Sequence, residues 1–238
     1  MDIILIPGLW LGAPSWDRVL PGLEAAGHRP RPLTLPGLES PDADRSGLGL
    51  LDHVETVVAE VDACSAGAAV VGHSAGAGLA WAAADARPDR VAHLVLVGGF
   101  PTPDGRPLAE GFATDGADLP LPDWSEFDDA DLRDLDPSIR EEFRRSAVPS
   151  PARLTTDPQR LSDERRYDVP LTVVCPEFSA DDLRSWIEAG EAPVAELSRA
   201  RRVRYVNLPT GHWPQFSRPD ELARVILAAV EPSGSTAR

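Results

Sequence analysis

Short apolar runs recur along the chain, separated by longer stretches in which apolar residues follow helical spacing. Most of the short runs are apolar at nearly every position, which is typical of strands buried on both faces of a parallel sheet. The predicted strands are Ile3–Ile6, Arg31–Leu35, Ala69–Gly72, Leu94–Val97, Leu171–Cys175 and Val203–Leu208.

The stretches between these strands predict helices, the first of which contains Pro21 as a local obstacle. Regular alternation of strand and helix favours an α/β fold. About six mostly parallel strands would then carry right-handed crossover helices on both faces. The predicted helices are Ser15–Ala26, Leu50–Ala63, Ser74–Ala86 and Asp220–Val230.

Residues 100–168 break this rhythm and are called the inserted segment below. They are rich in Pro, Asp and Glu, contain no good strand, and hold two short helix candidates, Asp129–Leu135 and Ser138–Arg145. The segment is too polar to form its own core, so we interpret it as a helical lid within a single domain spanning residues 1–238. We expect residues 232–238 to form a flexible tail.

The composition is that of a globular protein, with 238 residues, 42% hydrophobic and 26% charged. No apolar run reaches the roughly 20 residues of a membrane helix. The apolar start of the chain has no basic region before it and stops at Pro7, unlike a signal peptide. We therefore expect a cytoplasmic protein.

The formal net charge of −15 disfavours nucleic acid and anionic membranes as partners. All basic residues are Arg, and the absence of Lys excludes Schiff-base chemistry. Cys64 and Cys175 are too few for a disulfide framework or a zinc site. We expect a small-molecule substrate, no cofactor, no metal, and a monomer or homodimer.

The motif Gly72-His73-Ser74-Ala75-Gly76 fits G-x-S-x-G between a predicted strand and a predicted helix. A sharp strand-to-helix turn exposes the serine hydroxyl and holds it in a strained backbone conformation. The motif therefore predicts Ser74 as a nucleophile. The N–H of Ala75, at the start of the helix, would stabilise an oxyanion. The second oxyanion donor is expected in the loop after the first strand, at the N–H of Leu9.

His212 follows the last predicted strand and is the candidate general base, because α/β-hydrolases carry their residues in the order Ser, acid, His. Its neighbour Gly211 allows the loop to fold back over the sheet. The other histidines have structural explanations: His28 and His93 flank strands and His53 lies in a helix. His73, inside the turn, should point away from the substrate.

The acid that orients His212 is expected after the strand Leu171–Cys175. Glu177 is favoured because Asp181 and Asp182 fall in the first turn of a helix, where Ser179 and Asp182 resemble a capping box. Asp104 and Asp181 remain alternatives. The predicted pocket is apolar and lined by Trp10, Leu11, Phe100, Trp124, Phe178, Trp213 and Phe216.

With these residues in place, the chain resembles the α/β-hydrolase superfamily over its whole length. Residues 7–28, the run Leu33–Leu38 and the motif at Gly72–Gly76 look like its small methylesterase and hydroxynitrile-lyase-like branch. The resemblance implies a sheet that starts at the superfamily's third strand, a cofactor-free mechanism and a helical lid.

Three positions depart from that branch. Pro7-Gly8 stands where the family usually has His-Gly, so a side-chain contact in the oxyanion loop is lost. The acid strand ends in Cys-Pro-Glu-Phe where the family usually carries a Gly and a later Asp. Trp213 stands where hydroxynitrile lyases place a Lys, which argues against cyanohydrin cleavage.

The sequence therefore predicts a carboxylesterase-like serine hydrolase. Its substrate would be a carboxylic ester or thioester of a small, neutral, apolar compound, cleaved through an acyl-enzyme. Two alternatives remain open, since one fold hosts many reactions. One is a cofactor-free lyase or perhydrolase, and the other is a non-catalytic ligand-binding protein on the same fold.

Overall fold

The centre of the protein is a six-stranded sheet with the order β2-β1-β3-β4-β7-β8, in which every neighbouring pair is parallel. The computed structural model describes residues 1–231, so the predicted tail lies outside the described residues. The strands are β1 Asp2–Ile6, β2 Arg29–Pro32, β3 Ala68–His73, β4 Val91–Val97, β7 Leu171–Cys175 and β8 Val203–Asn207.

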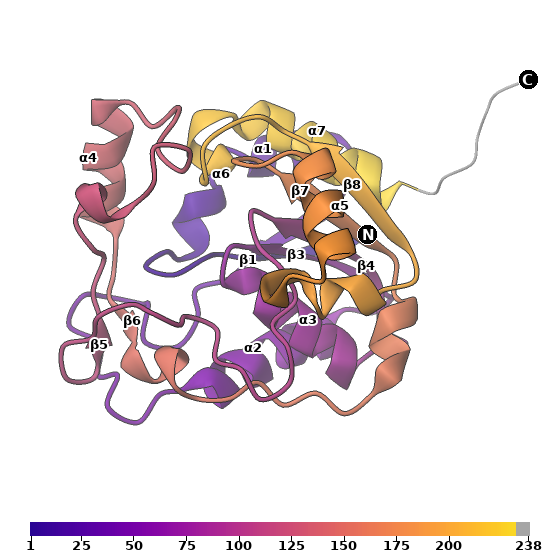
Figure 1. Ribbon diagram of the computed structural model, residues 1–238, viewed down its shortest axis with the longest axis horizontal. Helices are drawn as coiled ribbons and strands as arrows, with labels where there is room; N and C mark the ends of the chain where they lie inside the picture. The colour runs from indigo at the N-terminus through magenta and orange to yellow at the C-terminus, as the bar shows by residue number, and fades with distance from the viewer. Residues whose placement is uncertain (232–238) are drawn as a thin grey trace, which may run out of the picture.

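Helices cover both faces of this sheet (Figure 1). Successive side chains of β1 point to opposite faces of the sheet, so each face needs its own covering layer. Ile4 and Ile6 pack in the core that α2 and α3 cover, whereas Ile3 and Leu5 pack in the core that α1 and α7 cover. The α-helices are α1 Leu20–Ala25, α2 Leu50–Ala63, α3 Gly76–Ala86, α4 Pro137–Ser146, α5 Ala180–Ala189, α6 Pro214–Ser217 and α7 Pro219–Val230.

The strand order reverses beside β1. The chain first places β2 on one side of β1, then returns to place β3 on the other side and continues outward. In open parallel sheets, ligands bind outside the carboxyl ends of the strands at such a reversal. The loop after β1 and the turn after β3 meet at this point, and they contain Leu9 and Ser74.

Two predictions near the N-terminus were wrong. The expected helix Ser15–Ala26 is split into a 3-10 turn, Ala13–Trp16, and α1, because a proline lacks the N–H that a continuous helix would need at position 21. The expected strand Arg31–Leu35 lies earlier, as β2, whose register with β1 runs from Arg29 opposite Asp2 to Pro32 opposite Leu5. The apolar run Leu33–Leu35 marks burial rather than strand pairing.

The inserted segment contains α4, close to the predicted helix Ser138–Arg145. Residues 129–134 form turns instead of the predicted helix Asp129–Leu135, since aspartates compete with the backbone for hydrogen bonds. The sequence predicted no good strand in this segment, and the structure shows one short ladder there. Two-residue strands, β5 Asp118–Leu119 and β6 Ser150–Pro151, pair antiparallel. This β5–β6 ladder and α4 lie to the left of the main sheet in Figure 1.

Short 3-10 turns complete the described chain. They are Trp124–Glu126, Ala152–Thr155, Glu164–Asp168, Ala192–Val194 and Leu197–Arg199.

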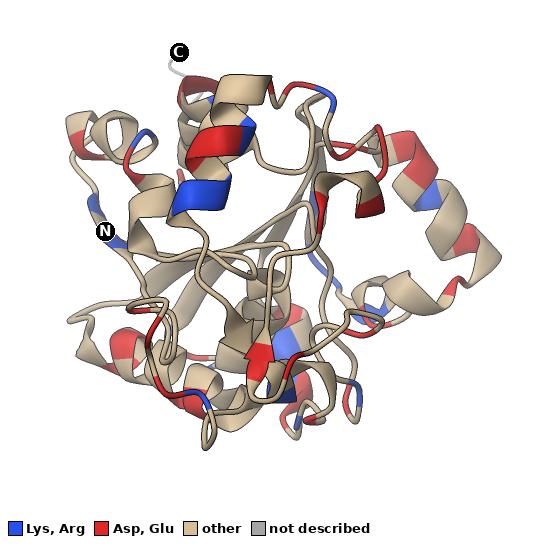
Figure 2. Ribbon diagram, turned by 90° about the vertical axis from the view of Figure 1, so that its left-hand side faces the viewer, with Lys and Arg blue, Asp and Glu red and all other residues tan. Residues whose placement is uncertain are grey.

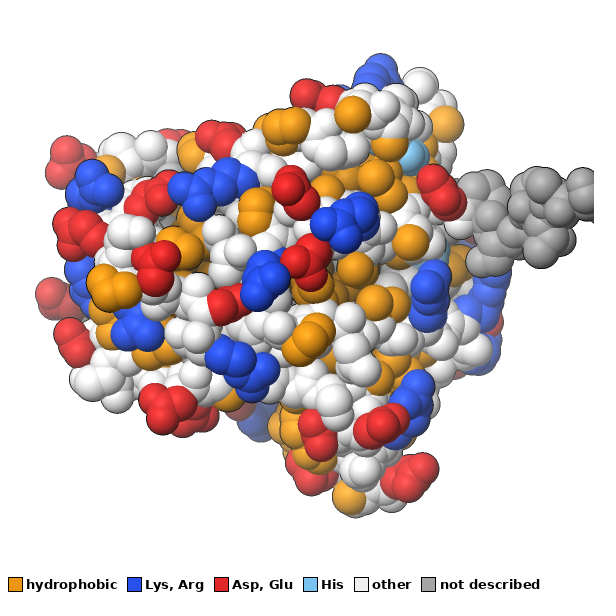
Figure 3. Space-filling model, turned by 90° about the horizontal axis from the view of Figure 1, so that it is seen from above, with side chains coloured by type: hydrophobic (Ala, Val, Ile, Leu, Met, Phe, Trp, Pro, Cys, Tyr) orange, Lys and Arg blue, Asp and Glu red, His pale blue; other side chains and the backbone are white. Residues whose placement is uncertain are grey.

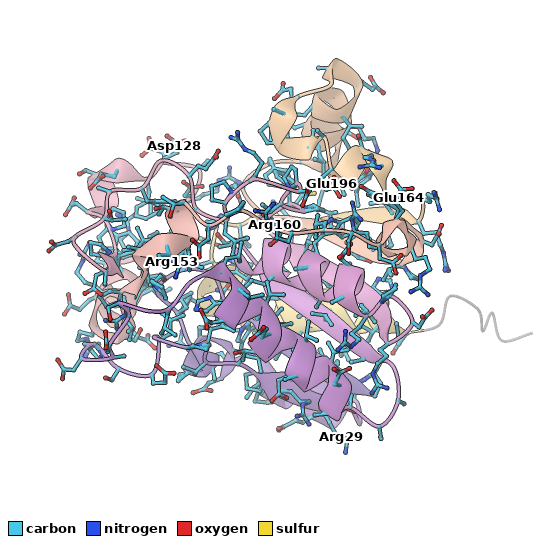
Figure 4. The ribbon with its side chains drawn as sticks, turned by 90° about the horizontal axis from the view of Figure 1, so that it is seen from below. Arg29, Asp128, Arg153, Arg160, Glu164 and Glu196 are labelled. Carbon is cyan, nitrogen blue, oxygen red and sulfur yellow. The ribbon has the colours of Figure 1, made fainter. Side chains whose placement is uncertain are left out.

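A buried ion-pair network connects α3 to neighbouring segments. The guanidinium of Arg166 contacts Asp85 at 3.0 Å and Glu196 at 3.0 Å, and all three side chains are at least nine-tenths buried. The indole N–H of Trp81 donates to the same Glu196 carboxylate at 3.0 Å. Glu196 is labelled in Figure 4, in the view from below. Because Asp85 and Trp81 belong to α3, the network ties this helix to the segments that precede β7 and β8.

Charged residues lie mainly on the outer helices and loops, and the strands are largely of other types (Figure 2). On the face seen from above, acidic and basic side chains are interspersed (Figure 3). Within residues 1–231, none of the helices combines the length and the apolar character needed to cross a membrane.

Candidate active site

Ser74 lies on a sharp turn between β3 and α3. Its φ of 52° is in the left-handed region, so α3 begins at Gly76 rather than at Ser74 as predicted. A Cβ at Gly76 would lie 2.7 Å from the carbonyl oxygen of Pro7. The glycine therefore allows the turn to approach the loop after β1. This is the geometry in which a serine hydroxyl stands clear of its own backbone.

Ser74, His212 and Glu177 form a continuous chain of hydrogen bonds. The hydroxyl of Ser74 is 2.9 Å from Nε2 of His212, and Nδ1 of His212 is 3.0 Å from Oε1 of Glu177. The two alternative acids are engaged elsewhere: Asp104 accepts the N–H of Leu161, and Asp181 pairs with an arginine in its own helix. Glu177 is thus the carboxylate, among those weighed from the sequence, that contacts His212.

The predicted capping box gives Asp182 a structural role at the start of α5. The hydroxyl of Ser179 accepts the N–H of Asp182 at 3.0 Å, and the carboxylate of Asp182 accepts the N–H of Ser179 at 2.9 Å. This reciprocal pair begins α5. It leaves Glu177 outside the helix, between β7 and α5, where its side chain reaches the ring of His212.

The surroundings of His212 favour its charged form. Burial alone would lower the pKa of the imidazole. The hydrogen bond to Glu177 and the negative charges of Glu177 and Asp131 outweigh this effect and raise the pKa above its ordinary value. The ring is therefore a stronger base than a free imidazole, and the two carboxylates stabilise the cation that forms when it takes a proton.

The backbone of His212 is held from two directions. Its N–H donates to the carbonyl oxygen of Asp131 at 2.8 Å, and its carbonyl accepts the Nε2–H of His73 at 2.8 Å. The amide of Gln215 donates to the other nitrogen of His73, which fixes this tautomer. Burial lowers the pKa of His73 to about 3, so this ring stays neutral. His73 therefore links the serine turn to the His212 loop.

The two predicted oxyanion donors lie beside Ser74. Leu9 and Ala75 line the same cavity as the serine. Throughout the described part of the chain, the N–H of neither residue donates to another protein group. Two free backbone donors next to a serine hydroxyl are an arrangement that can stabilise a developing negative charge on a carbonyl oxygen.

A cavity of about 240 Å³ opens at Ser74. Trp10 and Trp213 line it as predicted, together with three residues that the sequence analysis did not single out, namely Leu108, Phe112 and Phe127. A second, wider hollow of about 760 Å³ also reaches Ser74 and Ala75, and its wall contains Phe100. The walls nearest the serine are therefore predominantly aromatic and aliphatic.

Four predicted pocket residues line neither of the two hollows that reach Ser74. The ring of Trp124 packs behind it, edge-on to Trp213, and Phe178 packs against Phe100. Leu11 and Phe216 line a separate hollow of about 480 Å³ beside α4. Apolar character predicted burial for these residues, but it did not distinguish the cavity wall from the layer behind it.

Asp131 is a site residue that the sequence analysis missed. Its carboxylate lines the cavity and lies within 4.8 Å of ligand atoms of Glu177 and His212. These three residues form a group that could offer atoms to a cation. However, Glu177 and both ring nitrogens of His212 already take part in the hydrogen-bonded chain. The arrangement suits proton transfer, and Asp131 adds negative charge beside the imidazole.

Comparison with known proteins places this chain in a family. Residues 3–225 match the model of the "Alpha/beta hydrolase family". A pyrethroid hydrolase of Sphingobium wenxiniae is 28% identical, in a match that covers 94% of this chain and 86% of that protein.

Two solved structures share the fold. An extracellular alpha/beta-hydrolase from a Paenibacillus species has a TM-score of 0.75 at 18% identity, covering 96% of this chain and 98% of its own. A methylesterase protein from Arabidopsis has a TM-score of 0.74 at 17% identity, covering 97% and 98%. The match to the family model spans nearly the whole described chain, from β1 into α7. The protein is a member of the alpha/beta hydrolase family.

Proposed function

We propose that the protein is a serine hydrolase that cleaves a carboxylic ester or thioester through an acyl-enzyme. The observation that carries this proposal is the chain of hydrogen bonds from Ser74 through His212 to Glu177, with distances of 2.9 and 3.0 Å. A nucleophile, a base and an orienting acid joined in this way are the parts that acyl transfer requires.

In the proposed reaction, the hydroxyl oxygen of Ser74 attacks the carbonyl carbon while Nε2 of His212 takes the hydroxyl proton. The N–H groups of Leu9 and Ala75 stabilise the oxyanion. His212 then gives its proton to the leaving alcohol or thiol as the carbon–oxygen or carbon–sulfur bond breaks. Water, deprotonated by the same ring, attacks the acyl-enzyme and releases the carboxylic acid, which restores Ser74. Glu177 stabilises the imidazolium at both stages.

The proposed substrate is small, neutral and apolar. Aromatic and aliphatic residues line the cavity at Ser74, and the carboxylate of Asp131 in its wall would repel a negatively charged substrate. The names of the relatives, a pyrethroid hydrolase and a methylesterase, support ester cleavage as the reaction class. The cytoplasmic location and the monomeric or homodimeric state stay predictions.

A panel of esters with one leaving group tests the proposal. We expect p-nitrophenyl butyrate to be hydrolysed with a kcat/KM at least tenfold above that of p-nitrophenyl hemisuccinate. The two acyl groups are similar in length, but the hemisuccinate ends in a carboxylate. Equal rates, or a preference for the hemisuccinate, would contradict the proposed charge selectivity. Hydrolysis of neither ester, nor of shorter or longer homologues, would contradict the reaction class.

A further inference from the structure

Trp10 has a strained backbone. Among residues 1–231, Trp10 and Ser74 are the non-glycine residues with positive φ, at 65° and 52°. Bulky side chains disfavour this region, and such strain persists only where the surroundings hold it in place. The turn between β3 and α3 accounts for Ser74. Trp10 directly follows the proposed oxyanion donor Leu9, and it needs an explanation of its own.

Three hydrogen bonds hold Trp10, and all of them come from the inserted segment. Its N–H donates to the hydroxyl oxygen of Ser150 at 2.9 Å, and its carbonyl accepts the N–H of Val148 at 2.9 Å. Its indole N–H donates to the carbonyl of Leu119 at 3.1 Å. Every polar group of this residue is therefore bound by residues more than 100 positions away in the sequence.

The β5–β6 ladder that supplies two of these contacts is itself anchored. Leu119 and Ser150 face each other across it. The buried guanidinium of Arg45 donates to the carbonyl of Pro149 at 2.7 Å and pairs with Asp118 at 3.3 Å. The ladder is thus tied to the loop that precedes α2, and it offers the Trp10 backbone a fixed partner.

We propose that Ser150 is a positioning residue that sets the geometry of the oxyanion hole by holding the N–H of Trp10. The inference rests on the proposed function. The peptide plane that carries the Trp10 N–H is joined through a single Cα to the plane that carries the Leu9 N–H. A buried donor without a partner is strongly disfavoured. Without the hydroxyl, the strained φ of Trp10 loses the hydrogen bond that holds it. The backbone of Trp10 then relaxes toward negative φ, and the Leu9 N–H turns away from the oxyanion.

Two observations place Ser150 beside the proposed oxyanion donors. Its side chain is completely buried, so it serves the interior and not the surface. It also borders a small cavity whose wall includes Leu9 and Ala75, the two proposed donors.

The test compares Ser150→Ala, Ser150→Thr and a matched control, Thr34→Val. The hydroxyl of Thr34 accepts the N–H of Ala13 at 3.0 Å, in the same loop but beyond the strained residue. Removing an oxyanion donor outright lowers kcat by about 10²–10³. For the displaced donor in Ser150→Ala we expect a fall of roughly tenfold to a hundredfold in kcat, with KM changed by less than about twofold. Ser150→Thr restores kcat, and Thr34→Val keeps it near wild type.

Two further measurements separate positioning from general structural damage. Binding of a trifluoromethyl ketone, which forms a tetrahedral adduct with the serine, should weaken in Ser150→Ala by the same factor as kcat/KM. Amide hydrogen exchange at Leu9–Leu11 should rise in Ser150→Ala, and the melting temperatures of all variants are measured alongside.

The outcomes are distinguishable. Wild-type kcat and ketone affinity in Ser150→Ala would overturn the proposal, as would an equal loss in Thr34→Val. If the wild type hydrolyses no ester, the proposed function fails. Hydrogen exchange then decides the positioning role by itself, and unchanged exchange at Leu9–Leu11 overturns it.

Discussion

Asp131 faces the ring of His212 from the inserted segment, with a carboxylate oxygen within 4.8 Å of a ring nitrogen. The carbonyl of the same residue accepts the N–H of His212 at 2.8 Å. The inserted segment therefore supplies both a fixed backbone contact and a negative charge to the proposed base.

The first prediction concerns the pH dependence of the wild-type enzyme. The base must be neutral to accept the serine proton, and its carboxylate neighbours raise its pKa above the ordinary 6.5. The acidic limb of kcat/KM for a neutral ester should therefore have its midpoint above 6.5, with activity lost as the pH falls through that midpoint. A midpoint at or below 6.5 would show that burial outweighs the two carboxylates.

The second prediction assigns part of that effect to Asp131. In Asp131→Asn the negative charge is lost while a side chain of similar size remains, so the midpoint should move to lower pH and the plateau rate should change little. Asp129→Asn is the control, because Asp129 is exposed in the same turn. The same pH profile measures both. An unshifted midpoint in Asp131→Asn would show that its charge does not reach the imidazole.

The third prediction concerns Glu177. Glu177→Gln keeps the size of the side chain but removes the charge that stabilises the imidazolium, and the amide group can favour the wrong tautomer of His212. By analogy with the acid of serine proteases, kcat should fall on the order of 10⁴-fold. Asp181→Asn, an exposed acid near the start of α5, should retain wild-type kcat. If Asp181→Asn is impaired and Glu177→Gln is not, the acid is misassigned.

Sequence reasoning predicted the parts of the site that lie at strand ends. Ser74 and Glu177 follow apolar runs that form the inner strands β3 and β7, and His212 follows the edge strand β8. The parallel arrangement brings the carboxyl ends of these strands to one edge of the sheet. The capping box of Ser179 and Asp182 also gave Asp182 a structural role and left Glu177 as the favoured acid, because this motif is recognised from two residues three positions apart. These inferences needed only local patterns and the order of the strands.

The contributions of the inserted segment could not be predicted in this way. Ser150 meets Trp10 across 140 positions, and no periodic pattern marks either residue for that contact. Asp131 fell within a predicted helix, where it would have been one of several exposed acids. The turns that actually form there direct its carbonyl and its carboxylate toward His212. Long-range contacts made by irregular backbone leave little trace in a single sequence.

The fourth prediction concerns stability. Arg166→Met would leave Asp85 buried without its cation and Glu196 with only its longer contact to Arg199, and breaking such a buried pair typically lowers the free energy of unfolding by about 3–5 kcal/mol. For a protein of this size that corresponds to a melting temperature lower by roughly 10 °C. Arg165→Met, which removes the exposed neighbouring arginine, should melt close to wild type. Calorimetry on both variants checks the difference, and equal melting temperatures would contradict a stabilising role for the network.

The proposed nucleophile is tested most directly by the intact mass of the protein after reaction with a fluorophosphonate, with Ser74→Ala measured in parallel. We expect one adduct per wild-type chain and none on Ser74→Ala, with ester hydrolysis lost in the variant to the same extent. Labelling of Ser74→Ala, or a wild type that neither labels nor hydrolyses any ester, would contradict the assignment of Ser74 as the nucleophile of a serine hydrolase.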